Sequence, residues 1–236
     1  MKITYRLVGS ISAMAGILLM ILLLINCILV QDGFLNGTNA KYKVYKNVSM
    51  SEEELKVVVH HMIGYVKGQL DSPQVSVSIK DKQMEFFNEK ELGHLKDVRT
   101  LVNNLYITMW AFLLMSFGGV GYLIYQKKYM EIVKGIEISW IVLGVVTVVV
   151  GILALIDIDL VVTGFHKMFL SNSQWVLNPA LDRSVWMFRT RMYGDVIVVL
   201  GSIVVAVAAV SLGAAFGMRK MCKEKGEQYG KPGKRN

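Results

Sequence analysis

Two of the four histidines in the chain lie among residues that could support proton transfer. If the segment around His94 is helical, Glu91 and Asp97 share a face with it at a spacing of three residues on either side. His166 lies in a distant segment that is rich in aromatic residues. An imidazole with a pKa of about 6.5 both accepts and donates protons near neutral pH. Each histidine taken alone is also compatible with the charged end of an exposed helix.

Other kinds of chemistry have weaker support in the sequence. His60 and His61 lie in a segment with the periodicity of an amphipathic helix, where exposure or packing accounts for them. A metal-dependent hydrolase would combine His94, His166 and a carboxylate, but the chain has no His-Glu-x-x-His pattern and no comparably dense ligand spacing. A Walker-type glycine loop is absent as well. We therefore expect no metal, no cofactor and no nucleotide.

Four long segments without charged residues are the main elements that must position these histidines. They cover residues 7–31, 100–126, 138–156 and 196–218. Each is long enough to cross roughly 30 Å of hydrocarbon at about 1.5 Å per helical residue. The first exceeds the apolar core of about 7–15 residues in a signal peptide, so we expect it to remain as an uncleaved span. The sequence predicts an α-helical integral membrane protein with four transmembrane helices, which excludes a single soluble domain.

The charges between the predicted spans are distributed asymmetrically. Residues 1–6, 127–137 and 219–236 hold twelve basic and four acidic residues, whereas residues 32–99 and 157–195 carry no net charge. The positive-inside rule places both termini and the short loop in the cytoplasm and the two longer segments outside. Topology and attraction to anionic lipid account for the net charge of +8. A nucleic-acid partner is therefore not expected.

The first outer segment, residues 32–99, is predicted to form a small α+β extracytoplasmic cap. Residues 41–44 and residues 75–80 each alternate apolar and polar side chains, which is typical of strands. Between them, Ser51-Glu52-Glu53-Glu54 resembles a capping box. It opens a helix whose apolar residues, up to Val66, repeat every three or four positions. These patterns predict the order strand, helix, strand.

Two motifs lie next to the predicted spans. The pattern Phe-Asn-Glu-x-Glu-x-x-His-Leu-x-Asp-Val runs from Phe87 to Val98 and leads into the second span, so we expect one continuous helix there. The pattern Phe-His-x-x-Phe runs from Phe165 to Phe169 in the second outer segment, residues 157–195. With these motifs, the chain resembles the lipoprotein intramolecular transacylases over nearly its whole length. These are four-span bacterial membrane proteins with an extracellular cap.

The resemblance implies a reaction and a place for it. The enzyme would move the sn-2 acyl chain of a diacylglyceryl-cysteine lipoprotein to the α-amino group of that cysteine, which gives the lyso-form. His94 and His166 would be the catalytic residues, on the extracytoplasmic side of the bacterial plasma membrane where the cap meets the lipid. The expected partners are diacylglyceryl-modified lipoproteins and membrane lipid.

The chemistry of this reaction needs two complementary groups. The α-amine, with a pKa of about 7.7–8.0, must lose a proton before it attacks the ester. The departing glyceryl alkoxide must gain a proton, and the oxyanion needs a hydrogen-bond donor. We assign His166 as the amine base and His94 as the acid or oxyanion donor, with the reverse assignment as the alternative. Two histidines from different segments meet these needs without a covalent intermediate. Since an amide is more stable than an ester, no nucleotide is required either.

The neighbours of the two histidines are expected to support them. Asn88, Glu91 and Asp97 of the first motif are assigned to supporting and orienting His94. A second group of aromatic residues is assigned to the walls of the substrate pocket, where they would exclude competing water. They are Phe86, Phe87, Phe165, Phe169, Trp175 and Tyr193. For each of them, packing in the cap or in the interfacial belt is the alternative.

Two other functions are compatible with the architecture. A non-enzymatic membrane sensor or assembly factor also has spans and a cap, and it is the main alternative. A metal-dependent membrane hydrolase ranks lower because the ligand spacing is missing. Insensitivity to chelators would argue against the hydrolase, and loss of lipoprotein remodelling on replacing one histidine would argue against the sensor.

Overall fold

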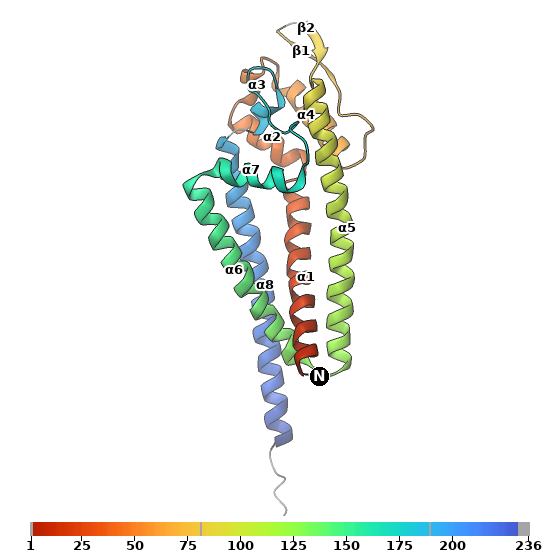
Figure 1. Ribbon diagram of the computed structural model, residues 1–236, viewed down its shortest axis with the longest axis vertical. Coiled ribbons are helices and arrows are strands. Elements are labelled where there is room, and N and C mark those ends of the chain that lie inside the picture. The colour runs from red at the N-terminus through yellow and green to blue at the C-terminus, as the bar shows by residue number, and fades with distance from the viewer. Residues whose placement is uncertain (1, 81, 189, 231–236) are drawn as a thin grey trace, which may run out of the picture. The chain divides into compact units, whose positions relative to one another are not determined.

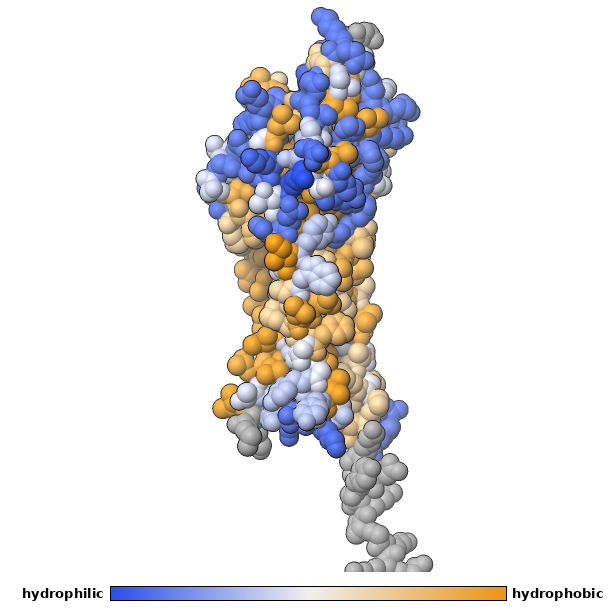
Figure 2. Space-filling view, turned by 90° about the vertical axis from the view of Figure 1, so that its right-hand side faces the viewer, coloured by the Kyte–Doolittle hydropathy of each residue, from blue (hydrophilic) through white to orange (hydrophobic). Residues whose placement is uncertain are grey.

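Four long helices dominate the computed structural model, which describes residues 2–80, 82–188 and 190–230 (Figure 1). They are α1 (Lys2–Ile28), α5 (Glu89–Tyr125), α6 (Tyr129–Ile156) and α8 (Thr190–Gly230). Among the described residues, these four helices are long and apolar enough to cross a membrane. Figure 2 shows hydrophobic side chains gathered over the surface of the long helices. The chain is a multi-pass α-helical membrane protein, as the sequence predicts.

The shorter elements lie between the long helices in the chain. They are α2 (Asp32–Lys41), α3 (Val44–Asn47), α4 (Glu52–Val66), β1 (Ser76–Ile79), β2 (Lys82–Glu85), α7 (Ile158–Phe169) and the 3-10 helix η1 (Ser184–Phe188). β1 and β2 form a two-stranded antiparallel sheet in which Val77 pairs with Met84. The chain forms two compact units, each from several segments. The membrane unit contains the described parts of residues 1–23, 108–155 and 202–236, and the cap unit contains residues 24–107 and 156–201.

Glycines allow close contacts between helices of the membrane unit. A Cβ atom at Gly9 of α1 would lie 2.3 Å from the carbonyl oxygen of Glu131 in α6. A Cβ atom at Gly135 of α6 would lie 2.2 Å from the carbonyl oxygen of Gly9. Ser139, which is buried, donates a hydrogen bond of 2.8 Å to the Gly135 carbonyl. Small residues let two backbones approach in this way, so α1 and α6 pack backbone against backbone.

Valine at Gly135 is expected to destabilise the membrane unit by roughly 2 kcal/mol or more, because its side chain would collide with backbone atoms that cannot rotate away. Gly144→Val is the matched control on the same helix, since a Cβ atom there meets nothing within 4 Å. Thermal unfolding of both variants in the same detergent measures the difference. Equal melting temperatures would contradict the backbone contact between α1 and α6.

The core of the cap unit is built on α4. The Ser51 hydroxyl accepts a hydrogen bond of 3.1 Å from the Glu54 amide, and the Glu54 carboxylate accepts one of 3.2 Å from the Ser51 amide. This reciprocal pair confirms the capping box. The apolar residues that were predicted to share one face of the helix are all buried. They are Leu55, Val58, Val59, Met62, Ile63 and Val66. They belong to the same core as Val77 of β1 and Leu95 of α5.

The strand predicted at residues 41–44 is wrong. Helix α2 ends at Lys41, Lys43 has a left-handed backbone with a φ of 51°, and α3 begins at Val44. Val44 and Val48 are both buried, and their spacing of four residues fits a helical turn rather than an alternating strand. β1, which the alternation at residues 75–80 predicts correctly, pairs with β2 instead. The cap is still α+β, but α2, α3 and α4 all precede its two strands.

Candidate active site

The helix that carries His94 begins with a reciprocal cap. The side-chain oxygen of Asn88 accepts a hydrogen bond of 3.0 Å from the Glu91 amide. The Glu91 carboxylate in turn accepts one of 2.9 Å from the Asn88 amide. These two bonds satisfy amide groups at the start of α5, in the manner of a capping box with asparagine in place of serine or threonine. Asn88 and Glu91 therefore fix the helix start, one turn before the half-buried His94.

Glu91 also binds a distant segment of the cap unit. Its second carboxylate oxygen accepts hydrogen bonds from the Ser184 amide at 2.6 Å and from the Ser184 hydroxyl at 2.7 Å. Glu91 is only 1% exposed, and a carboxylate so deeply buried requires donors of this kind. We call Asn88, Glu91, Asp182 and Ser184 the α5 clamp. It holds the start of η1 against the start of α5.

Asp182 completes the α5 clamp from the side of the distant segment. It is buried and accepts hydrogen bonds from the Asn88 side chain at 2.8 Å and from the Asn178 amide at 2.6 Å. Burial raises the pKa of Asp182, but these hydrogen bonds and the Lys90 ammonium 3.9 Å away outweigh it and lower the pKa below its usual value. Asp182 is therefore ionised at neutral pH.

Asp182 and Ser184 are functional positions that the sequence did not predict. They follow Asn178 and Pro179, and residues of these types are typical of an ordinary turn. The Asn178 side chain does support such a turn, since it accepts a hydrogen bond of 2.9 Å from the Ala180 amide. No local signal indicates that the same segment binds a helix start more than ninety residues earlier in the chain.

The structure brings His94 and His166 together in the cap unit. Their ring centroids are 5.9 Å apart, and the rings are tilted by 37°. The Nδ1 atom of His166 lies 2.8 Å from the Val162 carbonyl oxygen, one turn earlier in α7. Because a carbonyl oxygen only accepts hydrogen bonds, Nδ1 must carry the proton. The neutral ring of His166 therefore has its free lone pair on Nε2, which is the atom available as a base.

His94 has an environment that keeps it neutral. All charged residues of α5 lie in residues 89–99, and the charge-free remainder is long enough to cross a membrane, so His94 lies outside the spanning segment. Burial lowers the pKa of His94, the nearby imidazole of His166 lowers it further, and the Asp97 carboxylate raises it. Its Nδ1 atom is buried and has no hydrogen-bond partner among the described residues. A neutral imidazole presents one N–H group for donation.

Three of the predicted pocket aromatics surround His166. The Trp175 ring stacks on the imidazole, with centroids 4.7 Å apart and planes 22° apart. Phe165 meets the same imidazole edge to face at 5.7 Å, and Phe169 lies 4.8 Å from Phe165. Phe165 and Phe169 are each about half exposed. These rings give His166 an apolar environment.

Of the other three predicted pocket aromatics, two belong to the core of the cap unit and the third lies in α8. Phe86 and Phe87 are almost fully buried, with rings 4.9 Å apart, and both belong to the core around α4. This burial corresponds to the packing alternative, because the two residues follow β2 and turn into the core. Tyr193 is half-buried in the first turn of α8.

The loop after α7 runs along the first turns of α5. The Asp97 carboxylate accepts a hydrogen bond of 2.8 Å from the Asn172 side chain. One turn earlier, a Cβ atom at Gly93 would lie only 2.3 Å from the Gln174 side-chain oxygen, so glycine leaves room for the loop. The Trp175 indole N–H donates to the Asn172 carbonyl at 3.0 Å. These contacts hold Trp175 in the loop that lies against the helix of His94.

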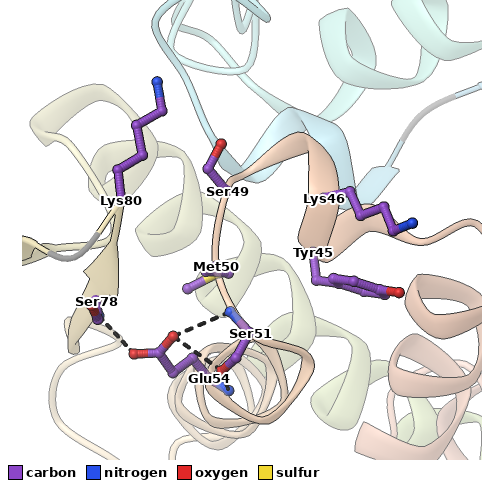
Figure 3. Close-up of a pocket in the computed structure, with 8 residues that line it drawn as sticks. All are labelled: Tyr45, Lys46, Ser49, Met50, Ser51, Glu54, Ser78 and Lys80. Carbon is purple, nitrogen blue, oxygen red and sulfur yellow. Dashed lines mark hydrogen bonds between the residues drawn. The ribbon is translucent and has the colours of Figure 1, made fainter.

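A separate pocket of the cap unit is open at the surface (Figure 3). Its lining comes from α3, α4, β1 and the turns beside them, and consists of Tyr45, Lys46, Ser49, Met50, Ser51, Glu54, Ser78 and Lys80. The Glu54 carboxylate is occupied by Ser51 and by the Ser78 amide, which donates at 2.8 Å. Neither His94 nor His166 lines this pocket. Among the described residues, no three His, Cys, Asp or Glu side chains gather in a way that could hold a metal ion.

Comparison with known proteins gives consistent matches. A family model described as lipoprotein intramolecular transacylase Lit matches residues 10–193. The in meso structure of the membrane-integral lipoprotein intramolecular transacylase Lit from Bacillus cereus matches with a TM-score of 0.76 at 15% identity, over 95% of this chain and 100% of that chain. Two structures of Bacillus cereus Lit with one histidine replaced, by arginine or by alanine, each match with a TM-score of 0.73 at 14% identity. They cover 94% of this chain and 95% and 96% of their own. No curated protein sequence matches significantly.

Proposed function

The chain belongs to the lipoprotein intramolecular transacylase Lit family, and we propose that His94 and His166 catalyse the transfer of the acyl chain. As a member of this family, the chain is a membrane acyltransferase that acts on lipoproteins. The substrate is a lipoprotein whose N-terminal cysteine carries a diacylglyceryl group and a free α-amine. The sn-2 acyl chain moves from its glyceryl oxygen to this amine, and the product is the lyso-form. The observation that carries the proposal is the pair of imidazoles with centroids 5.9 Å apart.

His166 acts as the base in this proposal. The α-amine nitrogen attacks the sn-2 acyl carbon, and its proton moves to Nε2 of His166. The hydrogen bond from Nδ1 to the Val162 carbonyl supports this role, since it leaves Nε2 with the lone pair. Stacking on Trp175 holds the ring in one orientation. The positive charge that develops on His166 also faces the electron-rich surface of the indole.

His94 acts as a neutral donor. As the tetrahedral intermediate forms, the N–H of the His94 ring donates a hydrogen bond to the oxyanion. When the intermediate collapses, the bond between the acyl carbon and the glyceryl oxygen breaks, and the departing oxygen takes the proton held by His166. The lowered pKa of His94 supports this role, because two protonated rings so close together would repel each other.

Geometry supplies much of the catalysis in this proposal. The cyclic intermediate has about eight members, so a flexible substrate rarely brings its amine to its own ester. Binding both ends at one site removes most of that entropic barrier. Phe165, Phe169 and Trp175 provide an apolar wall beside His166, which disfavours water as a competing nucleophile.

The orientation in the membrane follows from the charges. We place both termini in the cytoplasm and the cap unit on the extracytoplasmic side of the plasma membrane, because the net positive charge lies in the termini and in the loop between α5 and α6. A reporter enzyme that works only in the cytoplasm, fused after the last residue, is expected to be active. Activity of a reporter that requires export would contradict this orientation.

The reaction itself is tested in a host whose lipoproteins are diacylated and have a free α-amine. Expression of the wild-type chain is expected to move one acyl chain to the nitrogen at unchanged total mass, which fragmentation of the N-terminal lipopeptide detects. Wild-type protein that is well expressed and leaves the amine free would refute the proposed function. A mass increase by one acyl chain would also refute it, because the donor would then be a second molecule.

Asp97 gives a prediction for the pH dependence. Since this carboxylate raises the pKa of His94, Asp97→Asn is expected to lower that pKa, which NMR titration of the His94 ring measures. The neutral form of His94 then persists at lower pH. Asn172→Ala is the matched control, because it breaks the same hydrogen bond without changing the charge. An unchanged pKa of His94 in Asp97→Asn would contradict this electrostatic effect.

A further inference from the structure

The helix that carries His166 has an apolar face without a protein partner. Seven of the twelve residues of α7 are apolar, yet none of its residues is buried. Phe165, Met168 and Phe169 are 48%, 77% and 51% exposed, and their spacing of three and four residues places them on one face. The opposite face carries the polar side chains of Asp159, Thr163 and Lys167, which are four residues apart. None of the described residues of this face is buried, although Val161 and Val162 are partly covered.

The position of α7 in the chain identifies what covers this face. Helix α6 ends at Ile156, and Asp157 already caps α7 by accepting a hydrogen bond of 2.9 Å from the Asp159 amide. Residues 138–156 of α6 contain no charge, and Leu155 and Ile156 are 89% and 74% exposed. Such a surface on a spanning helix faces lipid. With a single residue between the two helices, the chain enters α7 directly from a spanning segment.

We propose that α7 is an interfacial helix whose apolar face is covered by the acyl chains of membrane lipids. Amphipathic helices of this kind bury one face about 5–10 Å into the boundary between headgroups and acyl chains. By the helical periodicity, His166 lies where the apolar and polar faces of α7 meet. It is therefore held at the depth where the glyceryl esters of a membrane-anchored substrate lie. This last consequence depends on the proposed function, whereas the lipid contact of α7 does not.

Spin labels on the two faces of α7 test the proposal. The full chain with Cys27→Ser and Cys222→Ser, which replace its two free cysteines, receives one new cysteine at a time. Val161→Cys and Met168→Cys report on the apolar face, and Thr163→Cys and Lys167→Cys are their matched controls on the polar face. The labelled proteins are placed in vesicles of phosphatidylcholine and phosphatidylglycerol. Collision rates are measured with oxygen, which concentrates in hydrocarbon, and with a water-soluble nickel chelate.

The ratio of oxygen to nickel collisions is expected to be several-fold higher at positions 161 and 168 than at positions 163 and 167. A nickel-dominated signal at position 168 would show that the apolar face lies in water, which overturns the proposal. Low collision rates with both reagents at position 168 would show that protein covers the face, from this chain or from a second copy, which also overturns it. The measurement needs no turnover. An inactive wild-type enzyme would therefore refute the proposed reaction and leave the result for α7 standing.

Discussion

Alanine in place of His94 or His166 is expected to lower the rate of acyl transfer by at least about a hundredfold, because general acid–base groups contribute factors of about 10²–10⁴. The two rings act on the same reacting carbon, so the double variant is expected to be little worse than either single variant. The measurement is the initial rate of N-acylation of a diacylated lipopeptide in vesicles, followed by mass spectrometry. A wild-type rate in either single variant would contradict catalysis by the pair.

His60 provides the matched control for these substitutions. It lies in α4, is well exposed, and has its Nδ1 atom 2.8 Å from the Asp32 carboxylate. His60→Ala therefore removes an imidazole from the same cap unit at a place away from the His94 and His166 pair. Its rate of acyl transfer is expected to stay close to that of the wild type. A large loss in His60→Ala would show that the assay reports on cap stability rather than on catalysis.

Glutamine at the two positions separates their roles. Its side-chain amide donates a hydrogen bond at any pH but does not accept a proton near neutrality. His94→Gln is therefore expected to retain more activity than His94→Ala, whereas His166→Gln is expected to be as inactive as His166→Ala. The opposite pattern would assign the base to His94 and the donor to His166, as in the alternative that the sequence leaves open.

Features that depend on local sequence were predictable. The absence of charge over about twenty residues predicts a span because the hydrocarbon interior penalises every charge, whatever its neighbours are. The α4 helix was predictable for a similar reason, since its capping box and apolar face both lie in residues 51–66. The alternation at residues 41–44 is too short to separate a strand from a pair of helical turns. In this segment, the burial of both Val44 and Val48 favours helical turns over a strand.

Features that join distant segments were not predictable from spacing. Gly9 and Gly135 are two among 21 glycines, and only the helix crossing distinguishes them from the others. Glu91 is a second example. Its position near His94 in the sequence suggested an orienting role, whereas its carboxylate binds Asn88 and Ser184. The pairing of His94 with His166 was expected from the resemblance to a family. No periodicity in the sequence predicts it.

The α5 clamp is expected to be a large single contribution to the stability of the cap unit. Glu91→Ala leaves the Asn88 amide and both donors of Ser184 without their acceptor in a buried place. Hydrogen bonds to a charged group are worth about 1.5–3 kcal/mol each, and unsatisfied buried donors cost about 1–3 kcal/mol. We expect the free energy of unfolding to fall by about 3–5 kcal/mol, measured as a lower melting temperature in detergent, since losses in one network are not additive.

Glu89→Ala is the matched control, because Glu89 is an exposed carboxylate in the same turn of α5. It is expected to change the stability by only a few tenths of a kcal/mol. Ser184→Ala removes the hydroxyl but keeps the amide donor, so its loss is expected to be about 1 kcal/mol. Equal melting temperatures for Glu91→Ala and Glu89→Ala would show that the clamp contributes nothing.

A double-mutant cycle between Glu91 and Ser184 separates direct coupling from general damage to the cap. If the hydroxyl and the carboxylate interact as the structure shows, Ser184→Ala costs less in the Glu91→Ala background than in the wild type. The clamp also bounds the segment from α7 to η1, which contains the loop with Trp175. Glu91→Ala is therefore expected to lower kcat even at temperatures where the cap unit stays folded, because the far end of the segment with Trp175 is then released from α5.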